Sequence, residues 1–169
     1  MPQAVLPLLV GEGSGQTLAD VTTNFPSPVL AIEAPTKTVD ITNCQVIPGK
    51  VIIVGRVTKN IAYKTAECRG TTPTANAQIC CGDLRHCTVQ VPFRLFIVVQ
   101  GAAPGDTCQV TQACVKGEVE NPTVNADGLI TALQETMDIH VAVRVTRDTV
   151  MNVSAARVPL TSNLVPFPR

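Results

Sequence analysis

The residues of this chain that are best able to do chemistry are its seven cysteines. A cysteine thiol can form a disulfide, bind a metal ion or act as a nucleophile. Seven is many for 169 residues, and it is an odd number. In an oxidising compartment this indicates a disulfide framework with one thiol left for a bond between chains. The disulfide candidates are Cys44, Cys68, Cys80, Cys81, Cys87, Cys108 and Cys114.

The densest group of potential metal ligands consists of Cys80, His86 and Cys87, to which Cys68 adds a fourth. Zinc sites usually present two cysteines separated by a few residues, so that both thiolates reach one ion. Here Cys80 is directly followed by Cys81, and adjacent residues of an extended chain point to opposite sides. We therefore interpret these cysteines first as disulfide partners and expect no cofactor. A zinc or redox protein is the second alternative.

Cys108 and Cys114 fall on the same face of a predicted strand. At roughly 3.3 Å per residue their Cα atoms are about 20 Å apart, well beyond the span of a disulfide. Each must pair with another strand, loop or subunit, or remain a buried free thiol. The spacing does not give the connectivity of the framework.

Catalytic motifs are scarce in the sequence. It contains two histidines, His86 and His140, and no serine or cysteine in a nucleophile motif. Asp138 shares a strand face with His140, but such a pair is most often a solvated surface. We therefore predict that the protein is not an enzyme and has no small-molecule substrate.

The charge balance argues against nucleic acid as a partner. Lysine and arginine total 13, as do aspartate and glutamate, whereas phosphate binding needs a positive surplus. Only 15% of residues are charged and 45% are apolar, which favours association of the protein with itself. No apolar run reaches the roughly 18 residues of a membrane span. We expect further copies of the chain as partners, and neither nucleic acid nor membrane.

Apolar and polar residues alternate along three segments, which predicts strands with one buried face. The segments are residues 51–63, 89–99 and 139–145. Pro92 favours an edge strand or a bulge in the second segment over a central strand, because proline cannot donate a hydrogen bond to a neighbouring strand. In the first segment the predominantly apolar face consists of Val51, Ile53, Gly55, Val57, Lys59, Ile61 and Tyr63.

Turn residues connect these segments to further strands. Pro48 and Gly49 predict a hairpin between a strand at residues 39–44 and the strand that follows. We expect turns at residues 103–106 and 125–128 and a strand at residues 108–119. Residues 129–137 fit either a short helix or a strand. The pattern predicts an all-β fold, an antiparallel β-sandwich or jelly-roll-like domain with extended N- and C-terminal arms.

The two ends of the sequence differ from the middle. We expect an N-terminal arm and hinge at residues 1–15, the sandwich domain at residues 16–156, and a proline-containing C-terminal tail at residues 157–169. The apolar residues of the arm are Val5, Leu6, Leu8, Leu9 and Val10, and the predicted hinge contains Gly11, Gly13 and Gly15. A phosphate-binding loop is not expected, because no helix-forming segment follows these glycines.

The segment at residues 50–55 (KVIIVG), continuing to Tyr63, resembles the central motif of the SPOCS domain. This family occurs in spore-coat-associated proteins of endospore-forming bacteria. The later motifs are similar in order: residues 91–93 (VPF), a Pro-Gly turn at residues 104–105, and a late strand at residues 139–146. The resemblance covers about residues 28–150, and it implies a β-rich, non-catalytic module used in building the spore envelope.

The chain differs from larger members of the family. It has a single module, no LysM-type wall-binding segment, and additional cysteines at residues 68–87. These differences favour a stand-alone building block. We therefore predict a self-assembling subunit of a bacterial spore-surface layer or extracellular filament, joined by strand addition of the N-terminal arm and by disulfides. The first alternative is a non-polymerising adaptor that recruits other spore-coat proteins.

No signal peptide is recognisable, because no lysine or arginine precedes the short apolar stretch near the N-terminus. The resemblance implies an explanation. Coat-type proteins are made in the mother cell and released when it lyses, so they need no export sequence. The expected location is the spore surface or the extracellular space.

Overall fold

The structure is a computed structural model, and it describes residues 3–66 and 81–152. Six β-strands and no helix form within these residues. The strands are β1 (Gln3–Ile32), β2 (Thr36–Ile47), β3 (Lys50–Thr65), β4 (Leu84–Val98), β5 (Thr107–Val124) and β6 (Ile130–Asn152). The all-β class predicted from the sequence is confirmed.

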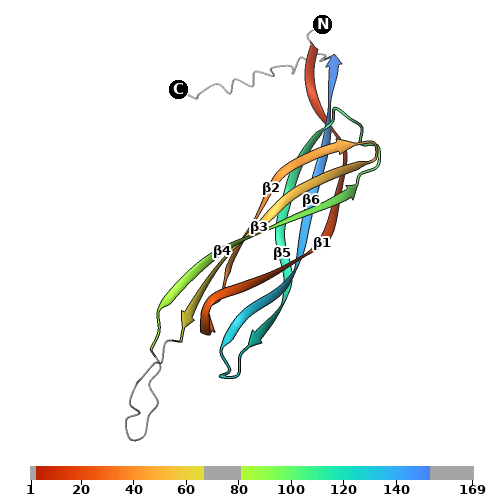
Figure 1. The fold of residues 1–169 in the computed structure, drawn as a ribbon. Coiled ribbons are helices and arrows are strands. Elements are labelled where there is room, and N and C mark those ends of the chain that lie inside the picture. The colour runs from red at the N-terminus through yellow and green to blue at the C-terminus, as the bar shows by residue number, and fades with distance from the viewer. Residues whose placement is uncertain (1–2, 67–80, 153–169) are drawn as a thin grey trace, which may run out of the picture.

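The strands form two antiparallel layers that pack face to face in an elongated sandwich (Figure 1). In one layer β3 lies between β2 and β4, and in the other β6 lies between β1 and β5. β2 packs over β5, and β4 packs over β1. The layers are joined at one end, where the last residues of β1 cross over and pair with the end of β3.

The core lies between the two middle strands, β3 and β6. Along both strands, buried residues alternate with more exposed ones. The sequence left residues 129–137 open between a helix and a strand. Of these, residues 130–137 belong to β6, in which Leu133 and Met137 are buried positions of the alternation. Two charged residues, Lys59 in β3 and Glu135 in β6, occupy buried positions of this pattern.

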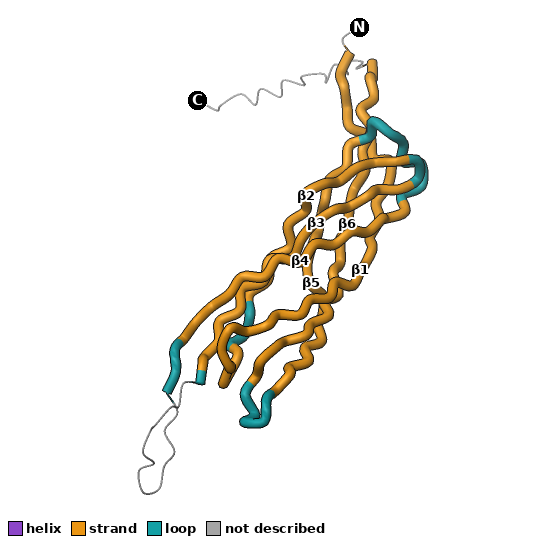
Figure 2. Tube along the Cα trace, viewed as in Figure 1, coloured by secondary structure: helices purple, strands orange, loops and turns teal. Residues whose placement is uncertain are grey.

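The predicted turns connect neighbouring strands. β2 and β3 form a hairpin in which Ile47 pairs with Lys50, and Gly49 adopts a φ of 72° that favours glycine. β4, which contains Pro92, pairs only with β3 among the described strands, so the edge-strand prediction is confirmed. Figure 2 shows the turns and loops, in teal, gathered at the two ends of the sandwich.

The N-terminal segment is not an arm on a flexible hinge. Residues 3–24 of β1 pair with β6 throughout, apart from a register shift between Leu9 and Gly11. The predicted hinge glycines are Gly11, Gly13 and Gly15. A Cβ atom on Gly13 would lie only 2.7 Å from Ile97 Cγ2. The hinge prediction is therefore wrong, because these glycines allow the side chains of β4 to approach the backbone of β1. The sandwich begins near residue 10 and not at residue 16.

The predicted C-terminal tail at residues 157–169 lies outside the described residues, as do Cys68 and Cys80. The described residues include no helix that could span a membrane.

Candidate assembly surface, cross-links and buried charges

A two-stranded ribbon projects from one end of the sandwich, beyond the loop between β4 and β5 (Figures 1 and 2). This terminal ribbon consists of residues 3–9 of β1 and residues 146–152 of β6. β5 pairs with β6 only as far as Thr146. Among the described strands, β6 alone pairs with residues 3–9. Within this part of the chain, both edges of the terminal ribbon are therefore open to a further strand.

The terminal ribbon exposes large apolar side chains. They are Val5 (62% exposed), Leu6 (44%), Leu8 (45%), Leu9 (61%), Val150 (60%) and Met151 (44%). Because successive residues of a strand face opposite sides, Val5 and Leu9 lie on one face of the ribbon and Leu6 and Leu8 on the other. Val10, which the sequence grouped with them, instead packs against the core at the register shift. These exposed apolar residues make the terminal ribbon the candidate assembly surface.

An ion pair holds the base of the terminal ribbon. Arg147 donates from Nε to Asp106 Oδ1 at 2.7 Å and from Nη2 to Asp106 Oδ2 at 2.8 Å. Arg147 Nη2 also donates to the carbonyl of Gly101 at 3.0 Å, and the Ala103 amide donates to Asp106 Oδ2 at 2.9 Å. The Arg147 hydrogen bonds and the Ala103 amide lower the pKa of Asp106 to about 2.

Cys44 of β2 and Cys108 of β5 form a disulfide, with their Cα atoms 6.1 Å apart. Both are half-buried and pack against the core. The bond joins the two layers of one chain, because β2 and β5 belong to different layers. It therefore cross-links one chain internally and does not itself connect two chains. Cys108 does not bond to Cys114, in agreement with the distance expected from the sequence.

The other described cysteines form no common site. Cys81 is exposed, while Cys87 and Cys114 are half-buried thiols outside any disulfide that the structure describes. Burial raises the pKa of the Cys87 thiol, and the positive charge of Lys59 partly offsets this effect.

The alternative zinc set is not assembled by the described residues. His86 and Cys87 are adjacent in β4, with His86 exposed and Cys87 half-buried, so their side chains point to opposite faces of the strand. The other two members, Cys68 and Cys80, lie outside the described residues.

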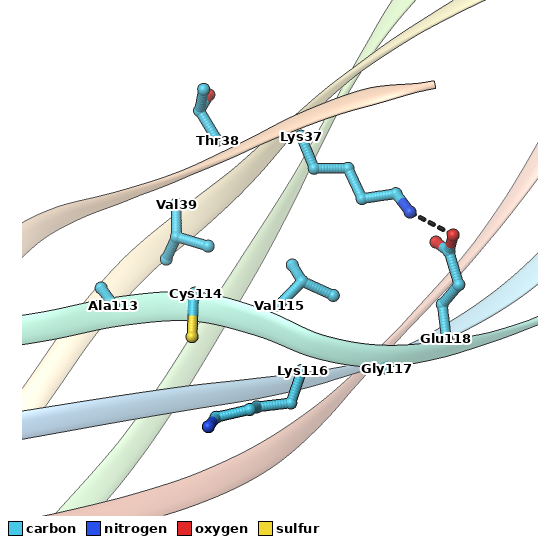
Figure 3. Close-up of a pocket in the computed structure, with 9 residues that line it drawn as sticks. All are labelled: Lys37, Thr38, Val39, Ala113, Cys114, Val115, Lys116, Gly117 and Glu118. Carbon is cyan, nitrogen blue, oxygen red and sulfur yellow. Dashed lines mark ion pairs between the residues drawn. The ribbon is translucent and has the colours of Figure 1, made fainter. Parts of the chain in front are cut away.

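An open hollow lies between β2 and β5, lined by residues 37–39 and 113–118. In Figure 3, Lys37 reaches across to Glu118, with which it forms an ion pair, while Cys114 points away from β2. β2 and β5 are not hydrogen-bonded to each other. The hollow is thus the open side of the sandwich, which the Cys44–Cys108 disulfide and this ion pair bridge.

A cluster of charged residues is buried between the layers. Lys59 forms an ion pair with Glu135, and the exposed fractions of their side chains are 1% and 0%. Lys59 Nζ also donates a hydrogen bond to Glu120 Oε1 at 3.0 Å and lies 3.7 Å from Glu118 Oε2. Apart from this ion pair, neither carboxylate oxygen of Glu135 has a hydrogen-bond partner among the residues described. Burying two charges with incomplete hydrogen bonding is costly.

The carboxylates of Glu118, Glu120 and Glu135 lie within 4.8 Å of one another, a spacing that suits a divalent cation. Lys59 Nζ lies among them and interacts with all three. The lysine ammonium therefore occupies the position at which a metal ion would neutralise the negative charge of the three carboxylates.

Sequence reasoning missed this cluster, although one signal was present. Alternation placed Lys59 on the apolar face of its strand, where a charged residue needs a buried partner. Glu135 was not recognised as that partner, because its segment also fitted a helix. The ion pair of Asp106 with Arg147 was missed because the two residues are distant in the sequence.

Comparison with known proteins identifies the family. The family model described as "SipL, SPOCS domain" matches residues 28–127, which include β2, β3, β4, β5 and the end of β1. No curated protein and no solved structure matches the chain significantly. Residues 3–9 and 146–152 of the terminal ribbon lie outside the matched region. Since the match covers more than half of the chain, the protein belongs to the SPOCS-domain family, which indicates a spore-coat-related role.

Proposed function

We propose that the protein is a non-enzymatic structural subunit that assembles with copies of itself into a layer or filament at the surface of a bacterial spore. Membership of the SPOCS-domain family supports the spore-coat-related part of this proposal. The low charge content and zero net charge support self-association.

The observation that carries the proposal is the terminal ribbon. It combines exposed apolar side chains with two strand edges that are open within the described residues. A strand of a neighbouring subunit can add to such an edge, gaining backbone hydrogen bonds and burying every second side chain. If the ribbon binds a different surface of the next subunit, the contact repeats head to tail and produces a filament or a ring. In this proposal the folded ribbon makes the contact between chains that the sequence analysis assigned to a free N-terminal arm.

Negative-stain electron microscopy of the purified chain tests this proposal. The informative variant is Leu9→Lys, which places a charge on the terminal ribbon at a position that is 61% exposed. The matched control is Leu18→Lys, a substitution of the same type in the same strand, at a position that is 67% exposed on the sandwich body. Circular dichroism verifies that both variants fold.

We expect filaments or sheets from the wild type and from Leu18→Lys, and uniform small particles from Leu9→Lys. Uniform small particles from the wild type would contradict self-assembly and favour the adaptor, whose partner is then sought among other spore-coat proteins. Polymers that form equally well from Leu9→Lys would contradict the role of the ribbon. Repeating the experiment with reductant shows whether disulfides between chains reinforce the polymer.

A further inference from the structure

We propose that Lys59 and Glu135 become joined by an amide bond between their side chains, with Glu120 as the proton relay. The bond would connect β3 in one layer to β6 in the other. This inference is independent of the proposed assembly, because the bond forms within one chain.

The two reacting groups are held together away from water. Lys59 Nζ contacts the carboxylate of Glu135, and both side chains are fully buried. Their neighbours two residues away on the same strand faces are apolar and also buried. These neighbours are Val57, Ile61, Leu133 and Met137. The fold thus places an amine and a carboxyl group in contact, which removes most of the entropic barrier to a bimolecular reaction.

The condensation requires the neutral forms of both groups. An ammonium and a carboxylate are both disfavoured by removal from water. If the ammonium of Lys59 transfers a proton to Glu135, the pair becomes a neutral amine and a neutral carboxylic acid. The amine is a nucleophile and the acid is an electrophile, whereas neither charged form reacts.

Glu120 is placed to carry the protons. It lies directly opposite Glu135 in the pairing of β5 with β6, and its Oε1 atom is 3.0 Å from Lys59 Nζ. Glu118 is less suited, because it forms an ion pair with Lys37 and lies 3.7 Å from Lys59 Nζ. Glu120 is also partly exposed, with 36% of its side chain accessible, so the released water has a path to solvent.

The reaction is a condensation that needs no oxidant or cofactor. The lone pair of Lys59 Nζ attacks the carboxyl carbon of Glu135 and forms the C–N bond. Glu120 accepts a proton from the attacking nitrogen and donates it to the hydroxyl group of the former carboxylic acid. The C–O bond breaks, water leaves, and Glu120 returns to its carboxylate form. The products are one amide and one water molecule.

The chain contains a matched internal control. Lys64 Nζ and Glu33 Oε1 form an ion pair at 2.7 Å, with half of each side chain exposed to solvent. These are the same two chemical groups, but both are accessible to water. Among the described residues, no ion pair places a third carboxylate beside them. We expect no bond between Lys64 and Glu33.

The test is mass spectrometry of the full wild-type chain after denaturation, reduction and alkylation of its cysteines. We expect an intact mass lower than that of the alkylated sequence by one water molecule. Trypsin should not cleave after Lys59, and the digest should contain residues 57–64 joined to residues 117–144. A wild-type chain with the full mass, or with these two peptides separate, would overturn the proposal, since an ion pair does not survive denaturation.

Two variants complete the test. Glu120→Gln removes the relay from a partly exposed position, and loss of a general acid–base group slows such reactions by roughly 10²–10⁴-fold. We expect freshly purified Glu120→Gln protein to be mainly unlinked, and complete linkage would overturn the relay role. Glu33→Gln is the matched control and should be fully linked between Lys59 and Glu135. Loss of the cross-link in this control would show that the loss in Glu120→Gln is not specific.

Discussion

Arg147 contacts Asp106 through both carboxylate oxygens, and this contact joins the base of the terminal ribbon to the loop that precedes β5. The ribbon therefore begins at a charged, geometrically defined contact. The side chain of Asp106 is only 3% exposed, although that of Arg147 is 48% exposed. A bidentate pair of this type fixes orientation as well as distance. The direction in which the ribbon projects is thus set partly by these two residues.

The ion pair predicts a specific loss of stability in acid. The pKa of Asp106 is lowered from 3.8 to about 2, mainly by its hydrogen bonds with Arg147. A carboxyl group with a lowered pKa in the folded state stabilises the fold above its unfolded pKa, and this contribution disappears as the pH falls through the folded pKa. The stability difference between the wild type and Asp106→Asn should therefore be constant above about pH 5, decrease as the pH falls below the unfolded pKa, and disappear as the pH falls through about 2.

Thermal unfolding of the two proteins between pH 1.5 and 7, in steps of about half a pH unit, measures this difference. The other carboxyl groups titrate in both proteins, so their effect on stability cancels in the difference. A difference that disappears already near pH 4 would show that the pair does not lower the pKa of Asp106.

Replacing a closely packed glycine of β1 with a larger residue should disturb the packing of β1 against β4. In Gly13→Ala the new Cβ atom would lie 2.7 Å from Ile97 Cγ2 and 2.8 Å from the Val98 carbonyl oxygen. Because backbone and core side chains must move, we expect a loss of about 1–3 kcal/mol in the free energy of unfolding. The matched control is Gly117→Ala, whose Cβ atom would meet nothing within 4 Å. Urea denaturation should show a change within about 0.5 kcal/mol for this control. Equal effects of the two substitutions would contradict the close packing of β4 against β1.

The disulfide within the chain predicts that the stability of the folded protein is sensitive to reduction. Replacing both Cys44 and Cys108 with serine should lower the free energy of unfolding by about 2–4 kcal/mol, because the unfolded chain loses a long closed loop. Cys114→Ser is the control and should change stability little. Peptide mapping without reductant should recover Cys44 bonded to Cys108. Recovery of Cys44 bonded to a second chain would contradict a disulfide between Cys44 and Cys108 of the same chain.

The burial of Cys87 predicts slow alkylation. Its raised pKa leaves little thiolate at neutral pH, and the thiolate is the form that reacts with iodoacetamide. We expect iodoacetamide to alkylate Cys87 more slowly in the folded protein than in denaturant. In the folded protein, the rate of alkylation should rise only at alkaline pH. Peptide mass spectrometry after timed labelling measures both rates. Equal rates in the folded and denatured protein at neutral pH would show that the thiol is accessible and unperturbed.

The sequence by itself determined much of the fold. Alternation of apolar and polar residues follows from the two faces of a strand, which is a local property, so it predicted the strands that became β3, β4 and the second half of β6. Pro92 marked an edge strand, and Pro48 with Gly49 marked a hairpin, because the backbone chemistry of proline and glycine acts over a few residues. Alternation even placed Lys59 on the buried face of its strand.

The tertiary structure alone decided which distant residues meet. The glycines at residues 11–15 have the composition of a linker, and only their packing against β4 shows why side chains are excluded there. Pairing of the N-terminal residues with the end of β6 likewise depends on a strand more than 100 residues away. The bond from Cys44 to Cys108 and the contact of Lys59 with Glu135 depend on how two layers stack. Such contacts are set by the packing of the whole chain, which leaves no periodic signal in the sequence.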